Sequence, residues 1–278
     1  MRKTGLLTVL FFTCFYAFSQ KGEDLFNAEN TEEFANYLLE SGQAEFAIKE
    51  FERLLYLKPE ALDAKQKLMQ AFRLSGQYEK GINRTKALFS PLQEMPRAHA
   101  IEYSKLLMSV RDWPQAESFW IKSEELSQTD KVIFLSTEYI FESQFAKAKS
   151  ILDKLQDSSN YVTQGYIRIV DNAQDMKRKS PFLAGVLSAI IPGLGKAYTG
   201  DWKDGLVSLI FTGGMAFQAA RKFKQFGPGD VRPWIYTSIG SGFYLGGVYG
   251  ATKSAQNKNR LKINHLQHEA SSLFNTYY

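Results

Sequence analysis

Small and bulky residues recur in a fixed order along residues 30–160, at intervals expected for packed helices. A small or polar residue is followed two positions later by a bulky one and five positions later by a small one. Four copies of this order stand at Gly42, Ala44 and Ala47; Gly76, Tyr78 and Gly81; Arg111, Trp113 and Ala116; and Ser143, Phe145 and Ala148. The first members are 34, 35 and 32 residues apart. A period of this length is typical of stacked helix-turn-helix units.

The helix before each turn carries a second regularity, in which residues i, i+1 and i+4 fall on one helix face. These sets are Leu68, Met69 and Phe72; Tyr103, Ser104 and Leu107; and Leu135, Ser136 and Tyr139. Together the two patterns resemble the tetratricopeptide repeat family, most closely in residues 42–51, with Pro59 where that family places its proline. Gly81, Arg111 and Ser143 depart from the family's usual alanine or glycine. The resemblance implies a helical repeat solenoid whose exact unit boundaries stay open.

The resemblance also implies a binding surface, because the first helix of each pair in such repeats lines a groove for a peptide or partner helix. The residues that would line this groove are Gln66, Gln70 and Arg73 in the second unit, Ile101, Lys105 and Met108 in the third, and Ile133, Thr137 and Ile140 in the fourth. The surface is mixed and carries no charge clamp, so it does not indicate the chemistry of the partner. A solvated face without a partner is the alternative.

Three later stretches have no charged residue, namely residues 180–195, 205–220 and 233–252. They contain 16, 16 and 20 residues, and a helix needs about 20 apolar residues to cross a bilayer. The third stretch has this length, and the second reaches it if the flanking Trp202 and Arg221 lie at the interface. Pro192 and Gly193 interrupt the first stretch, so it forms either an interfacial or re-entrant helix or a full span.

Small residues recur every four positions in the second and third stretches. They are Ser208, Thr212, Ala216 and Ala220 in the second, and Ser238, Gly242, Gly246 and Gly250 in the third. Glycines at this density weaken a helix in water by about 1 kcal/mol each, whereas in lipid such ladders allow close helix contact. We therefore expect a glycine-rich hairpin whose two ladders face each other. A seam between two copies of the chain is the alternative.

The passage between the first two stretches has the order Pro-Gly-x-Gly-x-x-Tyr-x-Gly, formed by Pro192, Gly193, Gly195, Tyr198 and Gly200. With the hairpin that follows, it resembles a group of small bacterial membrane domains that have two transmembrane helices. The resemblance covers residues 181–253. It implies that the motif residues form a bend at the membrane, and it implies no activity.

The net charge of the chain limits the kinds of partner that the sequence indicates. The chain has 278 residues and a formal charge of +5, from 34 basic and 29 acidic residues. This excess is too small to indicate nucleic acid, and much of it flanks the uncharged stretches, where basic residues commonly meet lipid headgroups.

The first residues have the order of a secretory signal peptide, with Arg2 and Lys3 before an apolar run and a small-x-small site that ends at Ser19. An uncleaved anchor, or lipidation of Cys14, is the alternative. Cys14 is the only cysteine, so removal of this segment would exclude disulfides.

No motif for catalysis, cofactor binding or metal binding is found. The glycines around Lys196 lack the spacing of a phosphate-binding loop, and His99, His265 and His268 form no metal-spaced set. Asp201 and Asp204 flank Trp202 and offer one candidate acid/base pair, for which helix capping and headgroup contacts are the simpler explanation.

The sequence thus predicts an all-α chain that is not an enzyme. Its expected parts are a signal peptide (1–19), about four repeat pairs (20–160), a capping helix and linker (161–179), a membrane domain (180–253) and an amphipathic or solvated tail (254–278). The predicted function is an envelope scaffold that binds proteins or peptides through exported, periplasmic repeats and sits in the bilayer. The alternative is an accessory subunit of a translocation or insertion machine whose hairpin docks or self-associates.

Overall fold

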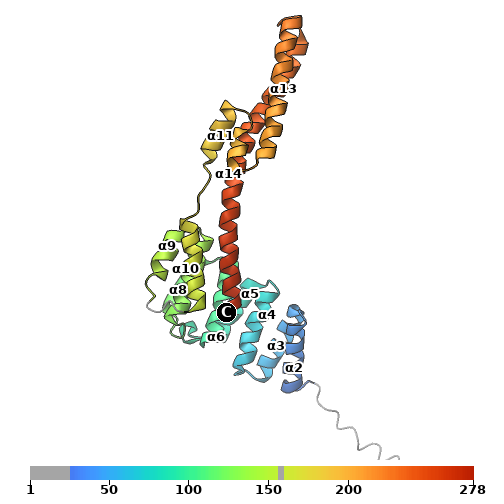
Figure 1. Cartoon of the computed structure of the whole chain (residues 1–278). Helices are drawn as coiled ribbons and strands as arrows, with labels where there is room; N and C mark the ends of the chain where they lie inside the picture. Colours follow the sequence, from blue (N-terminus) through green and yellow to red (C-terminus); the bar gives the residue numbers. More distant parts are fainter. Residues whose placement is uncertain (1–25, 156–159) are drawn as a thin grey trace, which may run out of the picture. The chain divides into compact units, whose positions relative to one another are not determined.

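The computed structural model describes residues 26–155 and 160–278. These residues form helices and no strand, which confirms the predicted all-α class for this part of the chain (Figure 1). The predicted signal peptide and Cys14 lie outside the described residues. Tertiary contacts divide the chain into two compact units, one up to Phe134 and one from Leu135.

The first unit contains α2 to α7 and the beginning of α8. The helices are α2 (Ala28–Glu40), α3 (Ala44–Leu57), α4 (Leu62–Leu74), α5 (Tyr78–Leu88), η1 (Leu92–Glu94), α6 (Arg97–Val110), α7 (Trp113–Lys122) and α8 (Gln128–Phe141). Between α2 and α7 each α-helix packs against the next, and α4 also packs against α6. Large side chains fill the core of this unit: Trp120, Tyr103 and Phe51 are buried, and the Trp120 indole Nε1 donates to Ser104 Oγ at 2.9 Å.

The four turns aligned from the sequence share one backbone conformation. Gly42, Gly76, Arg111 and Ser143 have φ angles of 79°, 72°, 57° and 58°, in the left-handed region that ends helices. Arg111 and Ser143 adopt it although a side chain costs about 1 kcal/mol there. The small residue five positions on is buried each time, because a bulkier one would collide with the preceding helix; a Cβ at Gly81 would lie 2.8 Å from Phe72 Cβ.

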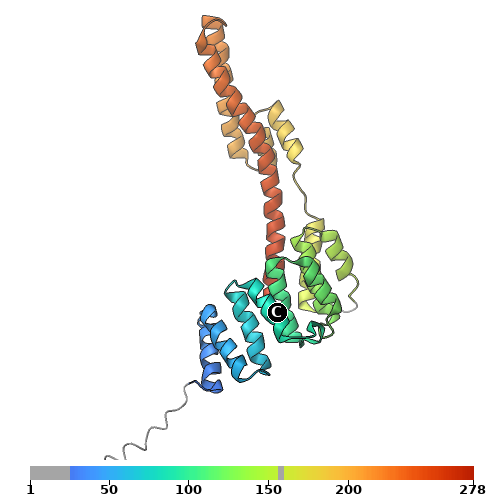
Figure 2. The same cartoon turned by 180° about the vertical axis from the view of Figure 1, so that it is seen from behind.

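The second unit contains the rest of α8 and the helices α9 (Phe145–Leu152), α10 (Tyr161–Gln174), α11 (Pro181–Ile190), α12 (Leu194–Thr199), α13 (Trp202–Phe226) and α14 (Val231–Tyr277). Ser180 caps α11, since its Oγ accepts from Leu183 N at 3.2 Å. α13 and the first part of α14 run side by side as a hairpin, with α11 against α14 (Figure 1, Figure 2).

A fifth turn of the same kind opens the hairpin. Gly200 has a φ of 96°, and the next amide, of Asp201, donates to Lys196 O at 2.9 Å, as Gln43 N does to Leu38 O at 2.8 Å. Trp202 follows two positions after Gly200 and the buried Gly205 five positions after it. The small, bulky, small order therefore continues beyond the four copies recognised in the sequence.

The structure bears on two expectations for the second half of the chain. The compact units do not divide at the predicted boundaries near 160 and 180, because α14 is one helix of 47 residues whose C-terminal part packs against α10. The tail from residue 254 is thus a continuation of the hairpin. A transmembrane hairpin was predicted over residues 180–253, but no helix in the described ranges combines the length and the apolar character needed to cross a membrane.

Candidate functional site

Two predicted groove residues, Arg73 on α4 and Lys105 on α6, contact the buried Glu102. Gln66, Gln70, Arg73, Lys105 and Met108 are partly exposed, and Ile101 is buried. The carboxylate of Glu102 pairs with Arg73 Nε and lies 3.4 Å from Lys105 Nζ through its other oxygen. The sequence analysis missed Glu102, which follows the predicted Ile101 directly and would have been found by testing neighbours of the groove positions for charge.

The predicted groove residues of α8 do not line an open surface. Ile133, Thr137 and Ile140 are buried, so this part of the predicted groove is corrected. Thr137 Oγ1 lies 2.5 Å from the hydroxyl of Tyr166 on α10, and the Ile140 carbonyl accepts from Gln267 Nε2 at 3.3 Å. Helices that follow much later in the chain therefore cover Thr137 and Ile140.

The C-terminal part of α14 provides this cover. Its Leu266, Ala270 and Phe274 are buried, and the Tyr166 hydroxyl donates to the Ala270 carbonyl at 3.3 Å. Burial raises the pKa of Tyr166 far above its usual value of 10, so the phenol stays protonated and able to donate. The tail that the sequence left as amphipathic or solvated is held against α10.

The residues of the Pro-Gly-x-Gly-x-x-Tyr-x-Gly motif lie where α11, α12 and α13 meet. A Cβ at Gly195 would overlap the carbonyl oxygen of Ala184, and one at Gly193 would overlap that of Gly205. Tyr198 accepts from Ser180 N at 3.2 Å through its hydroxyl oxygen. Gly193 and Gly195 thus allow three helices to approach closely. Gly200 provides the left-handed turn with its φ of 96°, and Pro192 lies in the break between α11 and α12.

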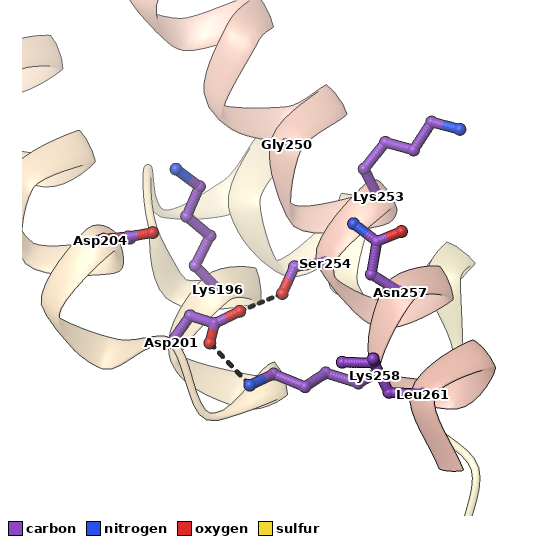
Figure 3. A pocket seen from close by; sticks show the side chains of 9 residues that line it. All are labelled: Lys196, Asp201, Asp204, Gly250, Lys253, Ser254, Asn257, Lys258 and Leu261. Carbon is purple, nitrogen blue, oxygen red and sulfur yellow. Dashed lines mark hydrogen bonds and ion pairs between the residues drawn. The ribbon is translucent and has the colours of Figure 1, made fainter. Parts of the chain in front are cut away.

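Next to this motif, α12, the start of α13 and the middle of α14 surround a cavity of about 300 Å³ (Figure 3). Apart from Gly250 and Leu261, the cavity is lined by polar or charged residues: Lys196, Asp201, Asp204, Lys253, Ser254, Asn257 and Lys258. In Figure 3 the side chains of Asp201, Ser254 and Lys258 point toward one another, whereas Lys253 points away.

Asp201 is the most strongly held group of the cavity. Ser254 Oγ donates to it, and Lys258 Nζ lies 3.0 Å from its Oδ1. The hydrogen bond from Ser254 and then that from Lys258 hold the pKa of Asp201 below its ordinary 3.8. A carboxylate that is ionised near neutral pH is a poor proton donor, so the geometry favours a structural role for Asp201 over the acid/base alternative.

The predicted small-residue ladders do not form the seam of the hairpin in full. Gly240 and Gly247 meet α13 instead, since their Cβ atoms would lie 3.1 Å from Met215 Cβ and 2.7 Å from Ser208 Oγ. Gly242 and Gly246 have open space around them, and Gly250 lies against Lys196. On α13, Ser208 and Thr212 belong to the seam, while Ala216 and Ala220 are exposed. The expectation that the two ladders face each other is corrected, because the α14 glycines that meet α13 are Gly240 and Gly247, not Gly242 and Gly246.

Large apolar side chains point outward over the hairpin region. Residues 180–253 are all described, and each buried one among them is Gly, Ala, Ser, Thr or Pro. The exposed large residues include Phe182, Ile190, Leu206, Ile210, Phe211, Phe217, Trp234, Ile235, Phe243 and Leu245. This is the reverse of the first unit, where large side chains form the core.

Within the two described ranges, no three His, Cys, Asp or Glu side chains are grouped to hold a metal ion. No protein-family model, curated protein or solved structure matches the chain. Both family resemblances therefore rest on the sequence patterns alone.

Proposed function

We propose that this chain is a membrane-anchored scaffold of the bacterial cell envelope. In this proposal, tetratricopeptide-like helices in an exported part of the chain bind a partner protein. The hairpin region of residues 180–253 holds the chain in a lipid bilayer. No catalytic step or cofactor belongs to the proposal.

The reversed distribution of side chains in the hairpin region carries the proposal. In water, large apolar residues gain about 1.5–3 kcal/mol each by burial, so their exposure over three helices indicates an apolar neighbour. Lipid is that neighbour in membrane proteins, where helices pack through small residues because lipid already solvates the large ones. The alanine cluster of Ala184, Ala251 and Ala255, with Tyr198 against it, is a core of this kind.

Basic residues lie at both ends of the apolar surface, where lipid headgroups would be in this proposal. One group consists of Lys253, Lys258 and the linker residues 177–179, and the other of Arg221, Lys222, Lys224 and Arg232. Trp202 and Trp234 are exposed near these two ends of the hairpin. Tryptophan and basic residues are enriched at membrane interfaces.

The surface of α4 and α6 is the proposed partner site. Arg73, Glu102 and Lys105 form a hydrogen-bonded charge cluster. Gln66 and Gln70 on α4 and Met108 on α6 are partly exposed. A side chain that joins such a cluster needs a charge or an amide, so we expect a polar peptide or helix as partner.

Membrane fractionation of the full chain tests the anchor. Replacing the exposed Ile210, Phe217 and Leu245 together by Asp should reduce the membrane-bound fraction at least tenfold, because each carboxylate resists transfer into hydrocarbon. A matched control replaces Phe46, Tyr56 and Ile121, which are equally exposed in the first unit, and should leave fractionation unchanged. Equal losses in both variants, with helix content preserved, would argue against an anchor in the hairpin.

A second experiment tests the partner surface in native membranes. A photo-crosslinking residue at Gln70 should yield a discrete adduct that is lost with Arg73→Glu, because charge reversal breaks the cluster with Glu102. The control change Lys58→Glu lies on the loop after α3. Adducts that survive Arg73→Glu would contradict the assigned surface.

Reporter fusions at residue 42 test whether the repeat region is exported.

One observation favours the accessory-subunit alternative as a second candidate. Gly242, Gly246, Ala216 and Ala220 are small and exposed, although small residues in lipid usually lie at helix contacts. If the hairpin docks on a membrane machine, large substitutions at Gly242 and Gly246 should abolish co-purification with that machine and leave membrane binding intact.

A further inference from the structure

The end of α14 packs against the α8–α10 surface like a ligand. Leu266, Ala270 and Phe274 are four residues apart and all buried, so they lie on one face of the helix. His268 and Ser272, on other faces, are exposed. In both views this end of α14 runs beside α10 (Figure 1, Figure 2).

The receiving surface has features that fit a helix. Gly165 on α10 leaves room for Leu273, since a Cβ at Gly165 would overlap that side chain. At the end of α8, the carbonyls of Ile140 and Phe141 accept from Gln267 Nε2 at 3.3 and 2.9 Å. The Ile140 carbonyl also accepts from Ser143 N at 3.0 Å, so Gln267 adds a second donor to the end of α8.

We infer that the α8–α10 surface is a helix-binding groove that the chain's own tail fills. Its ligand class is an amphipathic helix that carries Leu, Ala and Phe at four-residue intervals, with Gln directly after the Leu. The inference rests on the proposed scaffold function and adds to it a second partner site, which is distinct from the polar surface of α4 and α6. A partner that presents such a helix competes with the tail for the groove.

Two features make exchange of the tail physically feasible. The tail contacts the groove through one face only. Its release leaves the packing of α10 against α9 in place. The polar contacts of the tail are made by Gln267, by Tyr166 and by the Asn160 side-chain amide, which donates to the Tyr277 hydroxyl at 2.9 Å. Another helix can form equivalent contacts. Recognition of an amphipathic helix by a groove is a common binding mode.

A labelled peptide of residues 259–278 tests the groove in the full-length chain. Ala270→Arg should expel the tail, because no arginine fits a fully buried alanine position, while the groove itself is unchanged. We expect this variant to bind the peptide at least tenfold more tightly than the unaltered chain. The matched control His268→Arg changes an exposed tail position and should behave as the unaltered chain. A peptide that itself carries the Ala270→Arg change should not bind.

A change on the groove side identifies the surface. Adding Gly165→Leu to the Ala270→Arg variant should abolish peptide binding, because leucine fills the space of Leu273 and favours the α10 helix over glycine. The inference is overturned if the helical Ala270→Arg chain fails to bind the peptide. Equal binding by the unaltered chain, or binding that survives Gly165→Leu, overturns it as well.

If Ala270→Arg prevents folding, hydrogen exchange on the milder Gln267→Ala variant decides the question. Loss of the two carbonyl contacts should speed exchange of the tail amides at least tenfold and leave α10 protected. Unchanged tail exchange would overturn the inference. None of these measurements uses membrane binding, so failure of the proposed anchor leaves their outcome interpretable.

Discussion

At the scale of single residues, hydrogen bonding sets the chemistry of Asp201. Its carboxylate accepts from Ser254 and pairs with Lys258, while Ser254 Oγ also lies 2.8 Å from Thr199 Oγ1. These contacts join α12, α13 and α14 at one point. They stabilise the ionised carboxylate, which lowers the pKa of Asp201 and makes its contribution to stability depend on pH.

We expect Asp201→Asn to lower the stability of the chain by about 1 kcal/mol near neutral pH, a small value because the group is partly exposed. A carboxyl group whose pKa is lowered by folding stabilises the folded chain. This contribution is present in full at pH values above the unfolded-state pKa of about 4. This stability is lost as the pH falls through the folded pKa, below 3.8. The difference from the unaltered chain should therefore shrink as the pH falls below about 4.

Thermal unfolding as a function of pH measures this difference. Asp204→Asn is the matched control, because Asp204 is exposed and lines the same cavity, and it should show a smaller change. A difference for Asp201→Asn that does not shrink as the pH falls below about 4 would contradict the assigned contacts.

At the scale of elements, close backbone approach decides which glycines are needed. The positions of Gly193 and Gly195 admit no side chain, because the carbonyls of Gly205 and Ala184 occupy that space. Gly213 lies in α13 with nothing within 4 Å of its missing Cβ. Close packing of the helices in this region thus depends on a few glycines, such as Gly193 and Gly195. A glycine such as Gly213 makes no such contact and only lowers the stability of its helix.

We expect Gly195→Ala and Gly213→Ala to have opposite effects. Gly195→Ala should destabilise the hairpin region by at least about 2 kcal/mol, since α11 and α12 must move apart. Gly213→Ala should be neutral or stabilise by up to about 1 kcal/mol through helix propensity. Unfolding of both variants in the same detergent compares them. Equal effects would mean that the close approach at Gly195 does not matter for stability.

At the scale of the molecule, α14 connects two parts of the second unit. It pairs with α13 near its start and packs against α10 near its end. Between these contacts, Asn259 holds the linker that precedes α11: its Oδ1 accepts from Lys179 N and its Nδ2 donates to Lys179 O, both at 2.8 Å. Lys262 Nζ adds a contact of 2.8 Å to the carbonyl of Lys177.

We expect Asn259→Ala to expose this linker to trypsin. The linker residues Lys177, Arg178 and Lys179 are all trypsin sites, and loss of two hydrogen bonds of about 1 kcal/mol each should raise the cleavage rate about tenfold. Asn257→Ala, which removes a cavity side chain without a linker contact, is the control. Equal cleavage of the two variants would show that Asn259 does not restrain the linker.

Helix-forming signals in this chain are mostly local. The helical class and the break at Pro192 could be derived from the sequence because they depend on neighbours within about five residues. Gly200 carries the same signal as Gly42, but its membrane-like surroundings led to a different interpretation. The seam of the hairpin was predicted on the wrong glycines because Gly242 and Gly247 both suit close packing, and only the rotation of α14 against α13 distinguishes them.

The sequence by itself determined the position of the four repeat turns, the break at Pro192 and the stretches without charge, since residue spacing and left-handed turns act over short distances. Only the tertiary structure decided which faces meet. Tyr166 and Ala270 are 104 positions apart, and no periodicity connects them. The outward direction of the large apolar residues of the hairpin was decided in the same way. Burial depends on which surfaces come together, and this is a property of the folded chain.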